Sequence, residues 1–195
     1  MKKILIVGFG GHSKSCVEVI NNLKKYKISY YLTKEKKDIS ASVLFYDRKN
    51  LIKIFNKNIK LAHIGIGQIT NLRLRSIIYS ELIDLRFKLP KIVSKSSYLS
   101  KSSIIGDGSI IMNHAIVNTN VSLGNNVIIN NGAIVEHDCI IGDNVHIAPG
   151  AIINGGVKIG NNCFIGSGAV IKQQITIPPF TIVQAGRIIL GKNDL

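Results

Sequence analysis

The chain has 195 residues, with 25 lysines and arginines against 11 aspartates and glutamates and a formal net charge of +14. This length allows two small domains, and the positive charge favours anionic partners such as nucleotides, nucleic acid or an acidic membrane face. No apolar stretch reaches membrane-spanning length, and the short apolar run at residues 4–7 ends in glycines. We therefore expect neither secretion nor membrane insertion.

The charge is concentrated in the first half of the chain. Residues 1–91 hold 19 Lys and Arg against 6 Asp and Glu, whereas residues 92–195 hold 6 against 5. Most of these lysines are expected to be solvated on helix faces, because they show no regular interleaving with arginine and aromatic residues of the kind that favours nucleic acid. Lys/Arg runs and helix-like stretches end near Pro90, and a different kind of sequence follows. This change predicts two domains, at residues 1–91 and 92–195.

The chain opens with a predicted buried parallel strand at residues 2–7, a glycine-rich turn at residues 8–13, and a helix from Lys14 to about Leu23. Backbone N–H groups at such a helix start can receive a phosphate. The dinucleotide fingerprint is incomplete, because Ser13 stands at the position of its third glycine. The second predicted strand, residues 28–32, also lacks the acidic residue that would hold a ribose, so an NAD-dependent role is not expected.

A third strand and turn, at residues 61–67, lead into a helix predicted to carry Arg73 and Arg75. Strands that alternate with helices in this way indicate a small Rossmann-like α/β domain.

After residue 92, an aliphatic residue recurs at every sixth position. Sixteen successive positions, from Val93 to Val183, are all Val, Leu or Ile, and the position four residues later is almost always small or β-branched. An unbroken period of six predicts a parallel β-helix, whereas a β-sandwich would show a period of two. Gly and Asn cluster at the predicted turns, as in residues 124–126, where φ > 0 is expected.

Three cysteines, Cys16, Cys139 and Cys163, form an odd set without framework spacing, and two of them occupy small-residue positions of the repeat. We expect buried thiols in a reducing compartment, and hence a cytoplasmic protein.

His137 is the histidine with chemically useful neighbours. It lies between Glu136 and Asp138, in a segment with few other acidic residues. A carboxylate that bonds one ring nitrogen fixes the tautomer and raises the basicity of the other nitrogen, as a general base requires. A surface histidine with solvated neighbours is the alternative reading of this motif alone.

The repeat also bears on assembly. If three hexads close one coil, as known members of the fold suggest, the coil is 18 residues long and His146 lies half a coil beyond His137. The two histidines could then meet only across a boundary between copies, which suggests a trimer with active sites at its interfaces.

Both domains resemble the sialic acid O-acetyltransferase family of hexapeptide-repeat sugar acetyltransferases. The motifs that carry the resemblance are residues 8–14, residues 64–67 followed by Arg73, and residues 134–142. Within the family, the chain resembles the bacillosamine-type enzymes that N-acetylate nucleotide-linked 4-amino-4,6-dideoxy sugars. The resemblance implies a left-handed β-helix trimer, acetyl-CoA in the groove between copies, and an N-terminal domain that holds the nucleotide sugar.

The resemblance also implies roles for individual residues. His137 would be the general base, and Asp138 would orient its ring. The residues that would bind the nucleotide sugar are Gly10, Gly11, His12, Gly67, Arg73 and Asn130. The residues that would bind acetyl-CoA are His146, Gly155, Lys172 and Arg187. Among these, the Gly155 N–H would be the oxyanion donor, a role commonly worth ~3 kcal/mol. No metal is expected.

Several alternatives stay open. UDP and dTDP are both possible carriers, because Thr33 and Lys34 stand near the position where the family commonly shows an Asp pair. Sugar O-acetylation, as of a sialic acid, would use the same base. A zinc hydro-lyase of the γ-carbonic-anhydrase type is disfavoured, because His114, His137 and His146 lack the expected closely spaced pair. A non-catalytic scaffold is the last alternative.

Overall fold

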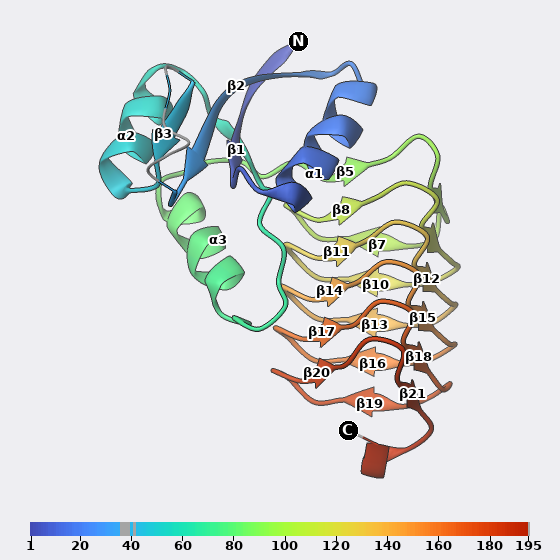
Figure 1. The fold of residues 1–195 in the computed structure, drawn as a ribbon. Helices are drawn as coiled ribbons and strands as arrows, with labels where there is room; N and C mark the ends of the chain where they lie inside the picture. Colours follow the sequence, from blue (N-terminus) through green and yellow to red (C-terminus); the bar gives the residue numbers. More distant parts are fainter. Residues whose placement is uncertain (36–39, 41, 195) are drawn as a thin grey trace. The chain divides into compact units, whose positions relative to one another are not determined.

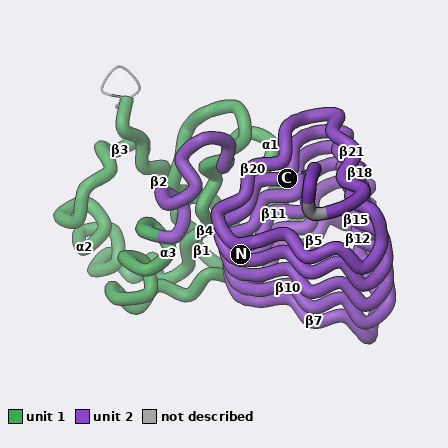
Figure 2. Tube along the Cα trace, turned by 90° about the horizontal axis from the view of Figure 1, so that it is seen from below, with its two compact units in different colours: residues 1–67, 77–90 green, residues 68–76, 91–195 purple. Residues whose placement is uncertain are grey.

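The structure is a computed structural model that describes residues 1–35, 40 and 42–194. It divides into two compact units, coloured separately in Figure 2. Unit 1 comprises Met1–Gly67 and Ile77–Pro90, and unit 2 comprises Gln68–Ser76 and Lys91–Leu195. These units differ from the predicted ranges of 1–91 and 92–195 chiefly by the segment 68–76, which groups with the β-helix although it precedes it in the sequence.

Unit 1 contains a four-stranded parallel sheet of order β3-β2-β1-β4. Its strands are β1 (Lys2–Val7), β2 (Tyr26–Thr33), β3 (Val43–Phe45) and β4 (Leu61–Ile64). The α-helices of the described residues are α1 (Gly11–Asn22), α2 (Arg48–Asn56) and α3 (Leu74–Asp84). Figure 1 shows α1 on one side of the sheet and α2 on the other. The predicted Rossmann-like domain is thus confirmed. No helix among the described residues is long and apolar enough to cross a membrane.

Two helix starts differ from the sequence prediction. Helix α1 begins at Gly11, three residues before the predicted Lys14, because Gly10 is already its extended N-cap. Helix α3 begins at Leu74, so Arg73 precedes the helix that it was predicted to occupy. The side-chain Oδ1 of Asn71 accepts hydrogen bonds from the backbone N–H groups of Arg73 (3.2 Å) and Leu74 (3.1 Å), which sets this start.

Unit 2 is a left-handed parallel β-helix in which each coil contributes one two-residue strand to each of three sheets (Figure 1). Paired residues are 18 positions apart, as in Ile128 with His146. The first sheet contains β5 (Ile92–Val93), β8 (Ile110–Ile111), β11 (Ile128–Ile129), β14 (His146–Ile147), β17 (Phe164–Ile165) and β20 (Ile182–Val183). The second contains β6 (Tyr98–Leu99), β9 (Ile116–Val117), β12 (Ile134–Val135), β15 (Ile152–Ile153), β18 (Val170–Ile171) and β21 (Ile188–Ile189). The third contains β7 (Ile104–Ile105), β10 (Ser122–Leu123), β13 (Ile140–Ile141), β16 (Lys158–Ile159) and β19 (Thr176–Ile177). A short 3₁₀ helix, η2 (Lys192–Asp194), follows the last coil.

The sixteen predicted aliphatic positions form the core of the coils. Those from Ile105 to Val183 are buried in one continuous cluster, and Val93 and Leu99 pack against it. The small positions face the same core, and Cys139 and Cys163 are among them. The period of six is thus confirmed as a β-helix whose interior is a column of Ile and Val.

Turn conformation and close contact between coils place separate demands on the turn residues, which the sequence analysis had treated as one. In the turns at residues 124–126 and 142–144, positive φ falls on the asparagines, with values of 55° at Asn126 and 57° at Asn144. Gly124 instead allows close approach of the next coil, because a Cβ there would lie 2.8 Å from the backbone N of Asp143. In these two turns Asn therefore supplies the turn conformation and Gly the space between coils, whereas at another corner Gly132 and Gly150 themselves have positive φ.

Candidate active site

His137 lies in the turn at residues 136–139, which joins β12 to β13. Its side chain is 61% exposed, and its Nδ1 lies 2.8 Å from Oδ2 of Asp138. Because a carboxylate only accepts hydrogen bonds, Nδ1 carries the ring proton and donates a hydrogen bond to Asp138. Nε2 is then left as the acceptor nitrogen, and no described residue lies in hydrogen-bonding position to it.

Asp138 is held in place by the coil before it. Its backbone N–H donates to the carbonyl of Thr119 (3.0 Å), and its Oδ1 accepts from Nδ2 of Asn120 (3.2 Å). The hydrogen bond from His137, aided by that from Asn120, holds the pKa of the Asp138 carboxyl below its usual range. The carboxylate therefore remains ionised and available to orient the ring. The sequence analysis missed Asn120, although its position 18 residues before Asp138 was a usable signal.

Glu136, the other predicted neighbour of the ring, turns elsewhere. Its Oε2 accepts a hydrogen bond from Nδ2 of Asn118 (2.8 Å) and a long one from the backbone N–H of His137 (3.4 Å). Only one of the two flanking carboxylates therefore contacts the imidazole.

Gly155 lies directly against the His137 ring on the next coil. A Cβ at Gly155 would be 2.6 Å from Cε1 and 2.7 Å from Nε2 of His137. No positive φ is involved at this position, so the need for glycine is purely steric. The predicted general base and the residue predicted to supply the oxyanion donor thus lie next to each other.

The backbone N–H of Gly155 has no acceptor among the described residues. Two coils earlier, the corresponding N–H of Thr119 donates to Oδ1 of Asn118 (2.8 Å). The equivalent side chain, that of Asn154, instead donates from Nδ2 to the carbonyl of Ile171 (2.7 Å). A proton acceptor and an uncommitted N–H donor therefore lie side by side.

Asn130 and His146 form a second, buried pair in the β-helix, and His146 is only 5% exposed. Oδ1 of Asn130 accepts from the N–H of Asn131 (2.8 Å), so its Nδ2 faces Nε2 of His146 (3.1 Å). Nδ1 of His146 lies 2.8 Å from the carbonyl oxygen and 3.3 Å from the backbone nitrogen of Gln68. Both ring nitrogens therefore have partners within the chain, and the two predicted ligand-binding side chains bond to each other and to the segment 68–76.

Gln68 anchors that segment and is 1% exposed. Its Nε2 donates to the carbonyls of Asn144 (2.8 Å) and Cys163 (3.1 Å). The sequence analysis missed Gln68, because no periodic pattern links it to partners more than 70 residues away.

The other predicted ligands of unit 2 lie at separate places. Lys172 is exposed on the same corner of the coils as Glu136 and His137, two coils further on, or about 10 Å at ordinary strand spacing. Arg187 lies on another corner, where its Nη2 donates to the carbonyl of Asp194 (3.1 Å). Arg73 stacks on Phe180, with its guanidinium carbon 5.0 Å from the ring centroid.

Unit 1 contains four of the six predicted nucleotide-sugar residues, Gly10, Gly11, His12 and Gly67, whereas Arg73 and Asn130 belong to unit 2. A Cβ added at Gly10 or Gly11 would meet open space, whereas one at Gly67 would lie 3.8 Å from Cβ of His12. Nε2 of His12 lies 3.4 Å from the thiol of the buried Cys16. This loop follows β1, at the edge of a parallel sheet where ligands commonly bind.

A cavity of about 160 Å³ lies at the same edge of unit 1. Its lining residues lie at or just beyond the carboxyl ends of the strands: Val7, Gly8, Phe9, Leu32, Thr33, Lys34, Tyr46 and Ile66. Within the described part of the chain, no three His, Cys, Asp or Glu side chains gather as a metal site would require.

Comparisons with known proteins agree with this architecture. Residues 3–82 match the PglD N-terminal domain, and residues 138–173 match the bacterial transferase hexapeptide family (six repeats). The solved acetyltransferase domain of PglB from Neisseria gonorrhoeae FA1090 is 31% identical, with a TM-score of 0.86, over 97% of this chain and 92% of that chain. The same domain has also been solved in complex with acetyl coenzyme A, with 30% identity over 98% of this chain and 93% of that chain and a TM-score of 0.85.

A further similar structure is PerB from Caulobacter crescentus, solved in complex with CoA and GDP-perosamine. It is 27% identical, with a TM-score of 0.88, over 97% of this chain and 89% of that chain. A search of the curated proteins finds no match to the sequence.

Proposed function

The chain belongs to the hexapeptide-repeat family of acetyl-CoA-dependent sugar N-acetyltransferases, and we propose that it acetylates the 4-amino group of a nucleotide-linked 4-amino-4,6-dideoxy sugar. The sugar is carried by UDP or dTDP, and the product serves surface glycan biosynthesis in the cytoplasm. The observation that carries the proposal is the geometry at His137, where a free Nε2 lies beside the uncommitted N–H of Gly155.

In the proposed reaction, the amine nitrogen of the sugar attacks the carbonyl carbon of the acetyl thioester. Nε2 of His137 accepts the proton that this nitrogen loses. The carbonyl oxygen becomes negative and accepts a hydrogen bond from the Gly155 N–H. When the C–S bond breaks, the protonated imidazole returns the proton to the CoA thiolate, so the products are an amide and free CoA.

Asp138 has a defined part in this mechanism. By accepting from Nδ1, it holds the tautomer with a free Nε2, and its charge stabilises the imidazolium that forms during attack. The lowered pKa of its carboxyl keeps that charge in place.

Binding roles are assigned to the remaining residues as follows. Gly10, Gly11, His12 and Gly67 hold the nucleotide sugar, supported by the open space at the first two glycines. Lys172 meets CoA phosphates, supported by its place on the His137 corner. The assignments of Asn130, His146 and Arg187 to ligands remain predictions, because their polar atoms bond within the chain.

We also propose a homotrimer. The outward residue of every strand in the second sheet is apolar and at least partly exposed, and the register stacks these residues in one column. The column consists of Tyr98, Ile116, Ile134, Ile152, Val170 and Ile188. Such a face favours contact between copies. His137 lies two residues after the end of β12, the strand that contributes Ile134 to this column.

The experiment that tests the function is release of the CoA thiol from acetyl-CoA in the presence of candidate acceptors. The panel contains UDP-, dTDP- and GDP-linked 4-amino-4,6-dideoxy sugars, and sialic acid. GDP is included because the Caulobacter protein was solved with GDP-perosamine. Turnover with an amino sugar supports the proposal and identifies the nucleotide. CoA release with sialic acid alone would make the protein an O-acetyltransferase. If none of the acceptors led to CoA release, both activities would be contradicted.

A further inference from the structure

Phe180 occupies a turn position that three preceding coils give to asparagine. Asn126, Asn144 and Asn162 have φ values of 55°, 57° and 60°, and Phe180 has 60°. Its N–H makes the same bond to the previous coil, donating to the carbonyl of Asn161 (3.0 Å). A bulky side chain is unfavourable in this conformation, whereas asparagine tolerates it. The ring nevertheless stands here, 46% exposed.

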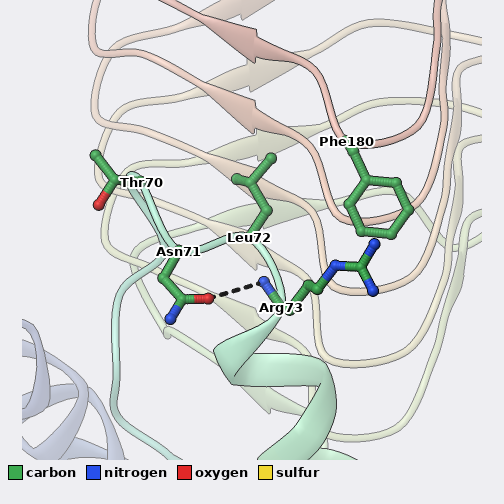
Figure 3. Close-up of a pocket in the computed structure, with 5 residues that line it drawn as sticks. All are labelled: Thr70, Asn71, Leu72, Arg73 and Phe180. Atoms are coloured by element: carbon green, nitrogen blue, oxygen red, sulfur yellow. Dashed lines mark hydrogen bonds between the residues drawn. The ribbon is translucent and has the colours of Figure 1, made fainter.

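Arg73 is presented to the ring of Phe180 by its own backbone contacts. Its N–H donates to Oδ1 of Asn71 (3.2 Å), and its carbonyl accepts from Oγ of Ser76 (2.8 Å). Figure 3 shows the guanidinium group beside the phenyl ring, with the Asn71 bond drawn at its base. No acidic side chain among the described residues pairs with this guanidinium. Its donors remain available to an anion.

The two side chains line an open cavity of about 570 Å³, together with Thr70, Asn71 and Leu72. All five residues belong to unit 2. The Thr70 hydroxyl and the Asn71 amide Nδ2 also have no partner within the described chain. The cavity thus combines a planar cation, an aromatic face and small hydrogen-bonding groups.

We propose that this cavity is a nucleoside phosphate site, in which Arg73 pairs with phosphate oxygens and Phe180 packs against the planar base. An arginine fork matches phosphate oxygens in a bidentate manner, and a base stacks on any aromatic face. A simple carboxylate would use the arginine but would leave the aromatic face exposed.

This inference rests on the proposed function, under which two ligands carry a nucleoside phosphate. One is the 3′-phosphoadenosine end of CoA, and the other is the nucleoside diphosphate of the sugar donor. The assignment goes beyond the predicted role of Arg73, because it adds Phe180 and a stacking ligand.

Binding of free nucleotides tests the site without any need for turnover. Calorimetric titration of the purified full chain would use adenosine 3′,5′-bisphosphate, UDP, dTDP and GDP. The variants are Arg73→Gln and Phe180→Asn, the second of which restores the residue that the same turn carries in three other coils. Arg86→Gln is the matched control for Arg73→Gln, since Arg86 is likewise an exposed arginine. Thermal unfolding confirms that each variant is folded.

For one nucleotide, we expect the Kd to rise about tenfold in Arg73→Gln and about fivefold in Phe180→Asn, with no change in Arg86→Gln. A response to the bisphosphate identifies the CoA end, and a response to a nucleoside diphosphate identifies the sugar donor. The site is refuted if wild-type protein binds none of the probes, or if both variants bind them as the control does. Failure of the acetyltransferase assay would leave these Kd values interpretable, so the two proposals can fail separately.

Discussion

At the scale of single residues, the candidate site is one corner of two adjacent coils. His137 and Asp138 are neighbours in sequence, whereas Gly155 joins them because it lies 18 residues later. Every protein group in the proposed mechanism therefore comes from the repeat itself. Single substitutions at this corner can test effects on kcat and on the free energy of unfolding separately.

The tautomer of His137 can be tested at Asp138. Asp138→Asn replaces an obligate acceptor with an amide that can donate to Nδ1, which moves the ring proton to Nε2 and removes the base. We expect kcat to fall at least ~100-fold. Asp138→Glu keeps a carboxylate and should retain much of the activity. Equal activity of the Asn variant and wild-type protein would refute the orienting role.

The Asp138 carboxylate should become protonated only at a pH below the usual range for aspartate. Because the hydrogen bond from His137 lowers its folded-state pKa, the stabilising effect of the carboxylate is complete above its unfolded-state pKa and is lost as pH falls through the lower folded value. Chemical shifts of the carboxyl carbon, followed through an acid titration, should show protonation below the usual range for aspartate. A midpoint at or above that range would contradict the dyad geometry.

Neighbouring glycines offer a matched pair of variants. Gly155→Ala would place a Cβ 2.7 Å from Nε2 of His137, so the ring must shift, and we expect at least a tenfold loss of kcat with little change in stability. Gly156 has a φ of 69° but no close neighbour, with its nearest contact 3.5 Å away at Gln174. Gly156→Ala should therefore cost about 1–2 kcal/mol of unfolding free energy while sparing activity. The reverse pattern in activity assays and urea melts would contradict the site.

Prediction from sequence succeeded for residues whose partners are adjacent or periodic. The His137–Asp138 contact follows from adjacency, and Asn120 was within reach through the coil length. Gln68 was out of reach, because its hydrogen bonds to Asn144 and Cys163 depend on how an irregular segment crosses the coils.

At the scale of elements, the period of six determines the core so strongly that each inward position could be assigned in advance. Irregular elements were less predictable. The start of α3 depends on the Asn71 cap, and the grouping of residues 68–76 with the β-helix depends on buried polar contacts that leave no pattern in the sequence.

The small positions of the coils make a prediction about thiol chemistry. Burial raises the pKa of Cys139 to about 11 and also raises that of Cys163, and both thiols donate to backbone carbonyls. Because the thiolate is the reactive form, both should resist iodoacetamide at about pH 8 in the native protein and react fully in urea. Mass spectrometry of the labelled peptides measures this. Rapid native labelling of either cysteine would show that the coils open locally.

At the scale of the whole molecule, the apolar column on the second sheet predicts association. Sedimentation equilibrium should give about three times the 21.3 kDa chain mass. Ile152→Asp places a charge in the middle of the column and should shift the protein toward monomer with loss of activity, whereas Lys158→Asp, on another sheet, should not. A monomeric, active wild-type protein would contradict the trimer.

The account depends most on His137 as the base in acetyl transfer to an amino sugar. The most direct measurement is the steady-state rate of CoA release by wild-type protein and by His137→Ala, with the best amino-sugar acceptor of the panel and with folding checked by thermal unfolding. The account predicts a fall in kcat of at least ~100-fold with little change in the KM for either substrate. An unchanged kcat in the folded variant would contradict it.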